Sequence, residues 1–239
     1  KFLTASGAGS RRKMTDAIKA GRVELNGQVV ESFTQPVNAA TDKITLDGER
    51  IANKTPGMLY LLLNKPKGIV STTSDDRHSK TVLDILPKEL RHSRLYPVGR
   101  LDKDSTGLIL LTNDGDLTYR LTHPKFEREK EYLVSINGNL STAQITALEQ
   151  GEDLEDGKTS PSKIRVVKSP PFNYSITIHE GKNRQVRRMF GMVGFTVLEL
   201  KRIRIDTLTI AGLPEGASRE LTTREVKGMK SPPLTKRKN

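Results

Sequence analysis

The residue with the clearest chemical potential is Asp102, which lies in a short polar segment between Gly99 and Gly107. The continuous apolar run of residues 108–111 follows at once and is typical of a fully buried strand. A carboxylate held in a loop against such a strand is well placed for catalysis. There it can act as a nucleophile or as a general base.

Aspartates in glycine-flanked loops more often serve local structure, because they cap helices or close turns. We expect that role for Asp104, which precedes Ser105, and for Asp114, which lies between Asn113 and Gly115. The local pattern alone favours the same role for Asp102. Its function must therefore be judged from the rest of the chain.

A strongly basic segment lies in residues 182–204, which contain seven Lys or Arg residues and one acid, Glu199. Val186, Met189, Phe190 and Val193 recur at helical spacing and predict one buried helix face. Basic runs are usually solvated surface. A surface with so much charge of one sign repels itself, however, and a polyanionic partner would offset that repulsion.

The composition indicates a basic globular protein. Hydrophobic residues make up 34% of the 239 residues and charged residues 28%, and the formal net charge is +12. Such a charge favours nucleic acid as a partner. The chain has no cysteine, which excludes disulfides and thiolate metal sites and agrees with a reducing compartment. No apolar run approaches the roughly 20 residues of a membrane span, so we expect a cytoplasmic protein without membrane association.

Residues 1–51 are predicted to form a small helical and β domain. Ser10 is a suitable N-cap for a helix over residues 11–20, and Asn26-Gly27 and Asp47-Gly48 are hairpin turns between short alternating strands. The first turn of the helix is basic and contains Arg11, Arg12 and Lys13. Residues 52–57 have the composition of a linker.

Residues 58–229 are predicted to form an α+β domain around a mixed, largely antiparallel β-sheet, because many strands are joined by hairpin turns and few helices separate them. The expected strands lie at residues 59–63, 108–111, 130–136, 163–167 and 174–178. The expected helices lie at residues 81–86, 142–148 and 182–190. The basic residues 230–239 are predicted to be a disordered tail.

Four motifs in order resemble the RsuA-type ribosomal RNA pseudouridine synthases. They are Asn64-Lys65-Pro66-Lys67-Gly68, Gly99-Arg100-Leu101-Asp102 with Thr106-Gly107-Leu108, Lys130-Glu131-Tyr132, and residues 180–189, Glu-Gly-Lys-Asn-Arg-Gln-Val-Arg-Arg-Met. The resemblance covers essentially the whole chain. Its first 48 or so residues resemble the small RNA-binding domain first described in ribosomal small-subunit protein four.

The resemblance implies a role for each matching residue. Asp102 corresponds to the essential aspartate, Tyr132 to the aromatic residue that packs on the target base, and Arg187 to the basic residue that pairs with the aspartate and favours its ionised form. It implies RNA contacts for a further set: Arg11, Arg12, Lys13, Lys65, Arg100, Lys182, Arg184 and Arg188. Isomerisation of uridine exchanges no electrons and hydrolyses nothing, so we expect no metal and no organic cofactor.

The implied partner is folded, pre-ribosomal RNA, and we expect a monomeric enzyme. The residues Asn183-Arg184-Gln185 and the run 201–204 look closer to family members that act on large-subunit (23S) RNA, and small-subunit (16S) RNA is the alternative. A non-catalytic RNA-binding assembly factor is a further alternative, which the presence of Asp102, Tyr132 and Arg187 disfavours. A glycosidase would need a second nearby acid, and strand alternation points Glu131 away.

Overall fold

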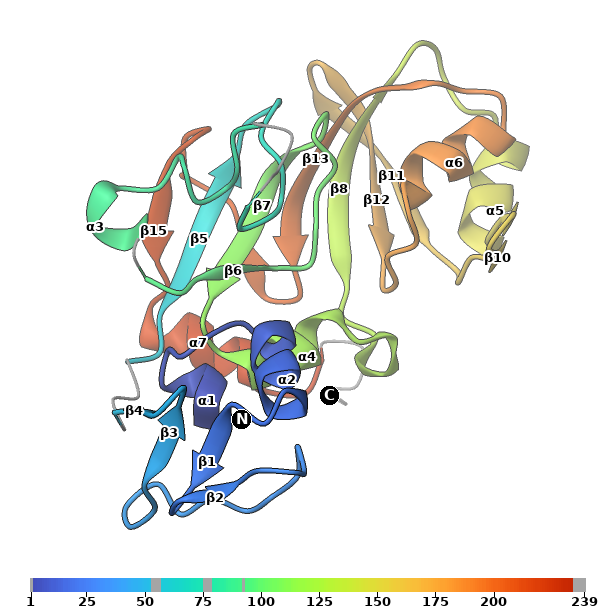
Figure 1. The fold of residues 1–239 in the computed structure, drawn as a ribbon. Helices are drawn as coiled ribbons and strands as arrows, with labels where there is room; N and C mark the ends of the chain where they lie inside the picture. The colour runs from blue at the N-terminus through green and yellow to red at the C-terminus, as the bar shows by residue number, and fades with distance from the viewer. Residues whose placement is uncertain (1, 53–56, 75–78, 92, 234–239) are drawn as a thin grey trace. The chain divides into compact units, whose positions relative to one another are not determined.

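The computed structural model describes residues 2–52, 57–74, 79–91 and 93–233 (Figure 1). The chain divides into two compact units, Lys1–Met58 and Leu59–Asn239. The predicted linker falls mainly on residues 53–56, and most of the predicted tail falls on residues 234–239, so both lie outside the described residues. Lys230, predicted to begin the tail, instead ends a helix.

The first unit packs two short helices, α1 (Phe2–Ala5) and α2 (Arg11–Lys19), with a four-stranded antiparallel sheet of order β2-β1-β3-β4. Its strands are β1 (Val23–Leu25), β2 (Gln28–Val29), β3 (Ile44–Leu46) and β4 (Glu49–Arg50). Ser10 caps α2 as predicted, because its Oγ accepts a hydrogen bond from the Lys13 amide at 3.2 Å. Met14 and Ala17 on α2 pack with Val23 and Ile44 in the core.

The second unit is built on a nine-stranded sheet whose main path runs β11-β12-β8-β13-β7-β5-β15, with β6 on β7 and β14 on β13. The strands are β5 (Tyr60–Lys65), β6 (Tyr96–Val98), β7 (Thr106–Thr112), β8 (Lys130–Ile136), β11 (Lys163–Ser169), β12 (Phe172–Ile178), β13 (Val197–Ile205), β14 (Leu208–Thr209) and β15 (Ser218–Glu220). Every pair is antiparallel except β7 with β13. The predicted fold class is confirmed.

Helices cover this sheet in two groups (Figure 1). Near β11 and β12 lie α5 (Thr142–Gln150), α6 (Gln185–Met192) and the small hairpin of β9 (Asp153–Leu154) and β10 (Gly157–Lys158). The helices α4 (Gly115–Thr122) and α7 (Thr223–Lys230) lie where β5 begins and β7 ends, and η1 (Pro124–Phe126) follows α4. Asp114 is the N-cap of α4, as predicted, and accepts from the Leu117 amide at 2.9 Å.

The prediction of a helix at residues 81–86 was wrong. This segment forms turns, in which the Asp84 carboxylate accepts hydrogen bonds from the amide of Thr81 at 2.7 Å and from its hydroxyl at 2.9 Å. This contact resembles the capping box that begins a helix, but Pro87 follows and disfavours the helical conformation at Leu86, so the segment does not continue as a helix. The helix comes later, after Pro87, as α3 (Lys88–Arg91).

Candidate active site

Asp102 lies in the loop of residues 99–105, which joins β6 to β7. The loop is anchored by Ser71, whose hydroxyl donates to the Leu101 carbonyl at 2.8 Å and accepts from the Leu101 amide at 3.1 Å. Leu101 and Ser105 are buried on either side of Asp102. The Asp102 side chain itself is 32% exposed, so the loop presents one accessible carboxylate on a fixed backbone.

The start of this loop and the strand that follows it, β7, are bound by one buried guanidinium, that of Arg202 on β13. Its Nε donates to the Leu108 carbonyl at 2.7 Å, and its Nη1 donates to the Arg100 carbonyl at 3.4 Å. Arg202 is only 2% exposed. β7 can approach β13 this closely because residue 107 is glycine: its φ is +103°, and a Cβ there would overlap the Arg202 carbonyl.

Tyr132 on β8 lies opposite Arg202 in the strand register. Its hydroxyl accepts from Arg202 Nη1 at 3.4 Å, and the guanidinium carbon is 5.9 Å from the centre of the Tyr132 ring. The Tyr132 side chain is 8% exposed. The ring is therefore held in position, with a small part left accessible.

Arg202 is a site residue that we did not single out from the sequence, where it was one of seven cations in a basic segment. The alternation of β13 was the signal that could have found it. Leu200 points into the core, and residue 202, two positions further on, must share its face. A buried cation at such a position calls for a structural or chemical role.

Lys65 occupies the interior rather than the RNA-facing surface, so its predicted role in RNA contact was wrong. It is fully buried at the end of β5, and its Nζ donates to the carbonyls of Pro66 at 3.0 Å and Ile69 at 2.8 Å. Burial lowers the pKa of Lys65 to about 8, although the negative charges of Asp104 and Asp102 oppose that shift. Lys65 thus holds the 66–69 turn under the Asp102 loop.

The arginines of the basic segment face the Asp102 loop from the N-terminal end of α6. Arg184 lies 3.6 Å from Asp102 and donates to both carboxylate oxygens of Asp104 at 3.3 and 3.2 Å. Arg187 is 3.2 Å from Asp104 and donates to the Val197 carbonyl at 2.8 Å. Two predictions need correction: Arg187 pairs with Asp104 rather than with Asp102, and Asp104 is an ion-pair partner rather than only a turn residue.

These contacts perturb the titration of Asp104. Desolvation raises its pKa, but the hydrogen bonds from Arg184 and the charges of Arg187 and Arg184 outweigh it, so the pKa of Asp104 lies below its usual value. The pKa of Arg184 is raised in turn by the hydrogen bonds to Asp104. Both groups are therefore charged at neutral pH.

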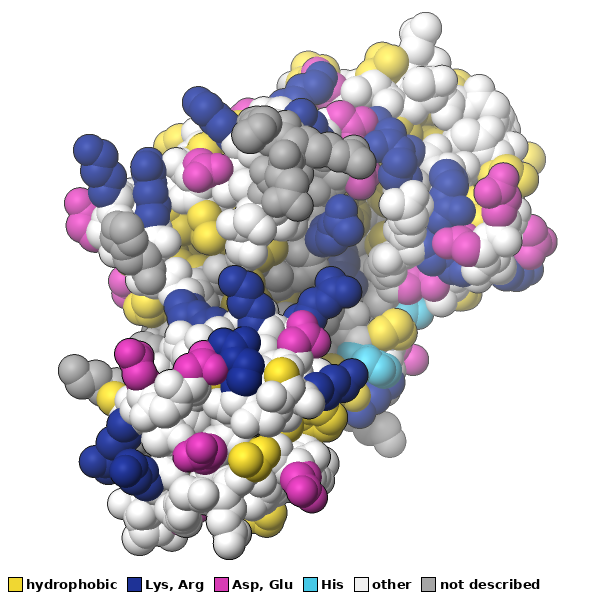
Figure 2. Space-filling model, viewed as in Figure 1, with side chains coloured by type: hydrophobic (Ala, Val, Ile, Leu, Met, Phe, Trp, Pro, Cys, Tyr) yellow, Lys and Arg dark blue, Asp and Glu magenta, His cyan; other side chains and the backbone are white. Residues whose placement is uncertain are grey.

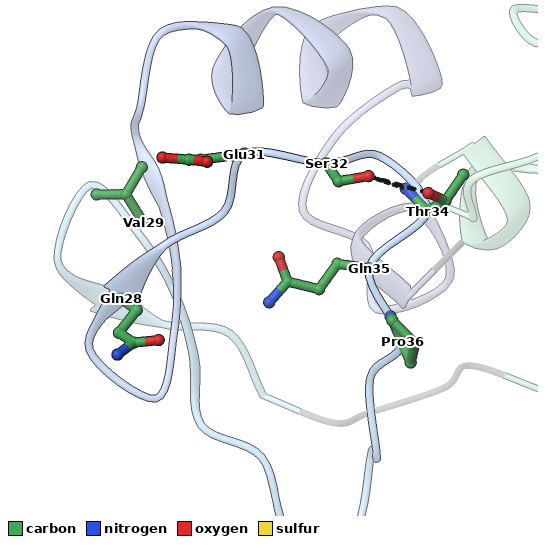
Figure 3. Close-up of a pocket in the computed structure, with 7 residues that line it drawn as sticks. All are labelled: Gln28, Val29, Glu31, Ser32, Thr34, Gln35 and Pro36. Atoms are coloured by element: carbon green, nitrogen blue, oxygen red, sulfur yellow. Dashed lines mark hydrogen bonds between the residues drawn. The ribbon is translucent and has the colours of Figure 1, made fainter.

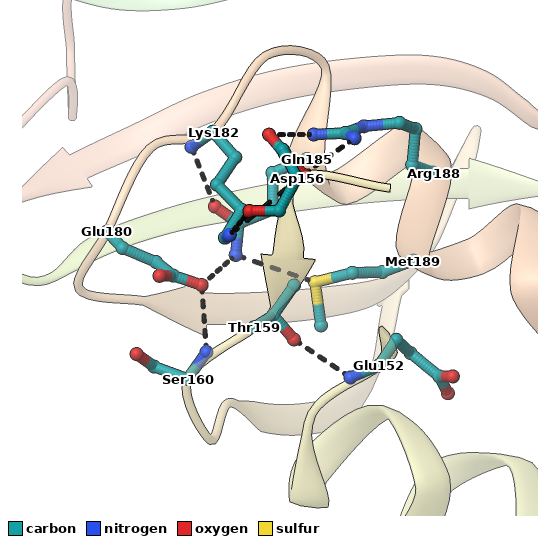
Figure 4. Close-up of polar contacts among 9 residues, drawn as sticks. All are labelled: Glu152, Asp156, Thr159, Ser160, Glu180, Lys182, Gln185, Arg188 and Met189. Carbon is teal, nitrogen blue, oxygen red and sulfur yellow. Dashed lines mark hydrogen bonds and ion pairs between the residues drawn. The ribbon is translucent and has the colours of Figure 1, made fainter. Parts of the chain in front are cut away.

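A second cluster of polar contacts joins α6 to the β9–β10 hairpin (Figure 4). Arg188 donates to both oxygens of the Asp156 carboxylate at 2.9 and 3.0 Å, and Lys182 Nζ donates to the Asp156 carbonyl at 2.6 Å. The Glu180 carboxylate accepts from Gln185 Nε2 at 2.6 Å and from the Ser160 amide at 2.9 Å. The hydrogen bonds from Arg188 lower the pKa of Asp156. Two of the predicted RNA contacts, Lys182 and Arg188, thus already have an acidic partner.

The remaining predicted RNA contacts are at the surface. Arg100 is exposed, and so are the three cations of the first turn of α2, Arg11, Arg12 and Lys13. Figure 2 shows Lys and Arg side chains spread over the visible face, with Asp and Glu between them. An open hollow in the first unit is lined by Gln28, Val29, Glu31, Ser32, Thr34, Gln35 and Pro36 (Figure 3). These seven side chains include no cation, and they do not form a catalytic set.

Among the described residues, no group of three or more His, Asp or Glu side chains could hold a metal ion. Within the same part of the chain, no helix is long and apolar enough to cross a membrane. The carboxylate of Asp102, the ring of Tyr132 and the surrounding guanidinium groups are thus the chemical groups that the fold brings together.

Comparison with known proteins shows the family of the chain. The profile of the RNA pseudouridylate synthase family matches residues 59–191. Ribosomal large subunit pseudouridine synthase B of Bacillus subtilis is 41% identical over 97% of this chain and 94% of its own length. An uncharacterized RNA pseudouridine synthase of Aquifex aeolicus is 37% identical over 95% of this chain and 90% of its own. The crystal structure of a pseudouridylate synthase superimposes with a TM-score of 0.69 at 32% identity, covering 95% of this chain and 97% of that one. The chain belongs to the RNA pseudouridylate synthase family.

Proposed function

We propose that this protein isomerises a uridine of 23S large-subunit ribosomal RNA to pseudouridine, with Asp102 as the catalytic carboxylate. One observation carries the assignment: a partly exposed carboxylate in a loop that the buried Arg202 fixes through hydrogen bonds to Arg100 in the loop and to Leu108 in the strand that follows. Family membership supports the reaction. The name of the Bacillus subtilis relative, a ribosomal large subunit pseudouridine synthase, supports the substrate.

The reaction sets clear demands on the site. The bond between C1′ of the ribose and N1 of uracil breaks, the base turns, and C1′ joins C5. The proton on C5 leaves and N1 gains one, so the balance requires no electron transfer and no hydrolysis. Asp102 supplies either the nucleophile or the base that removes a ribose proton. Both routes remain open, because both use the same exposed carboxylate.

The target uridine must leave its stack to reach Asp102. In this proposal Tyr132 supports the extruded base with the accessible part of its ring, and Arg202 holds that ring through the hydroxyl. Arg187, 11% exposed and close to the Asp102 loop, supplies positive charge to the reacting groups. A site closed by RNA would keep the detached uracil from escaping.

Affinity for RNA would come from cations at the surface. Lys182, Arg184 and Arg188 lie in and just before α6 with partly exposed side chains, and Arg100 lies on the Asp102 loop. The first unit is proposed to bind RNA as a domain of the kind found in ribosomal small-subunit protein four, and the exposure of Arg11, Arg12 and Lys13 supports this role. Contacts of this type bind phosphates with little sequence preference. The proposal includes a monomeric, cytoplasmic enzyme that acts on folded, pre-ribosomal RNA.

The test is tritium release from unmodified large-subunit ribosomal RNA that carries [5-³H]uridine. We expect Asp102→Asn to lose roughly 10³-fold or more in turnover, as removal of an essential catalytic group does, while RNA affinity stays within a few-fold. Glu220→Gln removes one exposed negative charge from β15 and is the control. Full turnover by Asp102→Asn would refute the assignment.

The substrate is tested separately by mapping pseudouridines in the ribosomal RNA of a deletion strain. We expect one or more sites to disappear from 23S RNA and to return with the wild-type gene but not with Asp102→Asn. Loss from 16S RNA instead would assign the enzyme to the small subunit. An unchanged map would favour a non-catalytic assembly factor.

A further inference from the structure

Asp104 is the most strongly contacted carboxylate of the catalytic loop. Arg184 donates to both of its oxygens, and Arg187 Nη2 lies 3.2 Å from Oδ2. The Asp104 side chain is 40% exposed, so it is reachable from the RNA side. Asp102, two residues earlier, has one ion pair among the described residues, with Arg184 at 3.6 Å.

Arg187 retains capacity for a further partner. Its side chain is 11% exposed, and its Nε and Nη2 are buried without a hydrogen-bond partner among the described residues. Asp104 is at ion-pair distance from Nη2, and only Nη1 makes a hydrogen bond, to the Val197 carbonyl. Buried donors without acceptors are costly and readily take up an acceptor that comes within reach.

We propose that Asp104 is a positioning residue for the reaction: it holds Arg184 and Arg187 at the Asp102 loop while leaving the Asp102 carboxylate open to the substrate. The inference rests on the proposed function of Asp102. Two guanidinium groups close to one loop repel each other, and the carboxylate between them offsets that repulsion. Without Asp104, Arg184 keeps only its 3.6 Å ion pair with Asp102, and Arg187 loses the carboxylate beside its Nη2, so neither guanidinium is held in place.

Asp104 also limits how much positive charge the site shows to RNA. Arg184 is 45% exposed, and its charge is partly offset by a carboxylate that carries no phosphate-binding capacity of its own. Removing the Asp104 charge frees this guanidinium for a phosphate. Loss of Asp104 should therefore strengthen RNA binding and slow the chemical step, two opposite effects that a merely structural role would not produce.

The experiment compares Asp104→Asn, Asp104→Glu, Asp102→Asn and the charge control Glu220→Gln. Single-turnover tritium release on unmodified 23S RNA gives the rate, and filter binding of the same RNA between 50 and 300 mM KCl gives the affinity. For Asp104→Asn we expect a turnover rate about 10-fold lower, an affinity about 3-fold higher at low salt, and a salt dependence steeper by about one phosphate contact. Asp104→Glu keeps the charge and should recover most of the rate.

Weaker or unchanged RNA binding by Asp104→Asn, or an unchanged rate, would overturn the inference. A parallel loss of rate and thermal stability, with Asp104→Glu as impaired as Asp104→Asn, would reduce Asp104 to a structural residue and would overturn it equally. Failure of the proposed function has a different signature. In that case Asp102→Asn keeps full turnover, whereas the effect of Asp104 on RNA affinity can still be measured without any turnover.

Discussion

Two groups of cations surround the Asp102 loop, and they differ in what they bind. The inner cations, Arg202 and Lys65, are buried and donate to backbone carbonyls. The outer cations, Lys182, Arg184 and Arg188, are partly exposed and pair with the carboxylates of Asp104 and Asp156. A phosphate of RNA can replace the carboxylate partner of a cation at the surface, but it cannot reach a buried cation. The inner cations thus fix the position of the loop, and we propose that the outer ones supply affinity for RNA.

The largest effect is expected from Arg202→Met, which removes an inner cation while keeping much of its volume. The Arg100 and Leu108 carbonyls and the Tyr132 hydroxyl lose their donor, and the loop and ring can shift. Misplacement by about 1 Å typically costs around 10²-fold in rate, so we expect turnover to fall about 100-fold with RNA affinity changed less than about 3-fold. Tritium release and filter binding measure the two quantities.

Arg202→Lys is the matched variant, because an ammonium cannot reproduce the fork of a guanidinium that serves separated acceptors. It should recover little of the rate. Circular dichroism must show that both variants fold. A defect mainly in RNA affinity would move Arg202 to the outer group and break the comparison.

The second prediction concerns Lys65 and pH. Its folded-state pKa of about 8 is below the ordinary 10.5, so between these values the unfolded chain holds more protons. The free energy of unfolding therefore rises with pH from about 8 to 10.5, by at most about 1.4 kcal/mol per pH unit for one group. Burial also lowers the pKa of Lys130 to about 8, so Lys130 contributes to the same rise in the free energy of unfolding between pH 8 and 10.5.

Lys65→Met should remove about half of that rise. Urea unfolding of the wild type and the variant at pH 7, 8, 9 and 10 provides the measurement. The control is Lys103→Met, which removes an exposed lysine from the Asp102 loop. An identical pH dependence in wild type and Lys65→Met would mean that Lys65 is not desolvated as its position indicates.

The smallest effect is expected at an outer cation. Arg188→Ala breaks a partly exposed ion pair with Asp156, and such pairs contribute about 0–1 kcal/mol to stability. If Arg188 contacts a phosphate in the complex, RNA affinity falls a few-fold and the slope of log affinity against log salt decreases by about one. Turnover at saturating RNA should stay unchanged. If Arg188→Ala instead lowered turnover at saturating RNA and left RNA affinity unchanged, Arg188 would belong with the inner cations.

Much of the fold was predictable because its signals are local. The Ser10 cap, the Asn26-Gly27 turn, the apolar run of β7 and the alternation of β8 each depend on a few neighbouring residues. The helix predicted at residues 81–86 is absent: Asp84 binds the Thr81 amide as in a capping box, but Pro87 follows too closely for a helix to continue.

The site was less predictable, because its contacts join segments far apart in sequence. The resemblance predicted roles for Asp102, Tyr132 and Arg187, which stay predictions, and it did not indicate that Arg187 would pair with Asp104. Lys65 looked like a surface cation in a Pro- and Gly-rich motif, and only the packing of β5 between β7 and β15 buries it. Tertiary structure decides whether a lysine or arginine faces solvent or buried carbonyl groups, and a count of charges along the sequence does not distinguish the two environments.

The parallel pairing of β7 with β13 has a consequence for the order of folding. It joins residues 106–107 to residues 201–202, and in the described sheet it links the β8, β11, β12 and β13 half to the half that contains β5 and β6. Contacts between such distant segments form late, because a long loop must close first. A chain still being synthesised therefore carries Asp102 without the α6 arginines or Arg202. The Asp102 loop, made early, therefore gains its hydrogen bond from Arg202 only after β13 has been made and has docked.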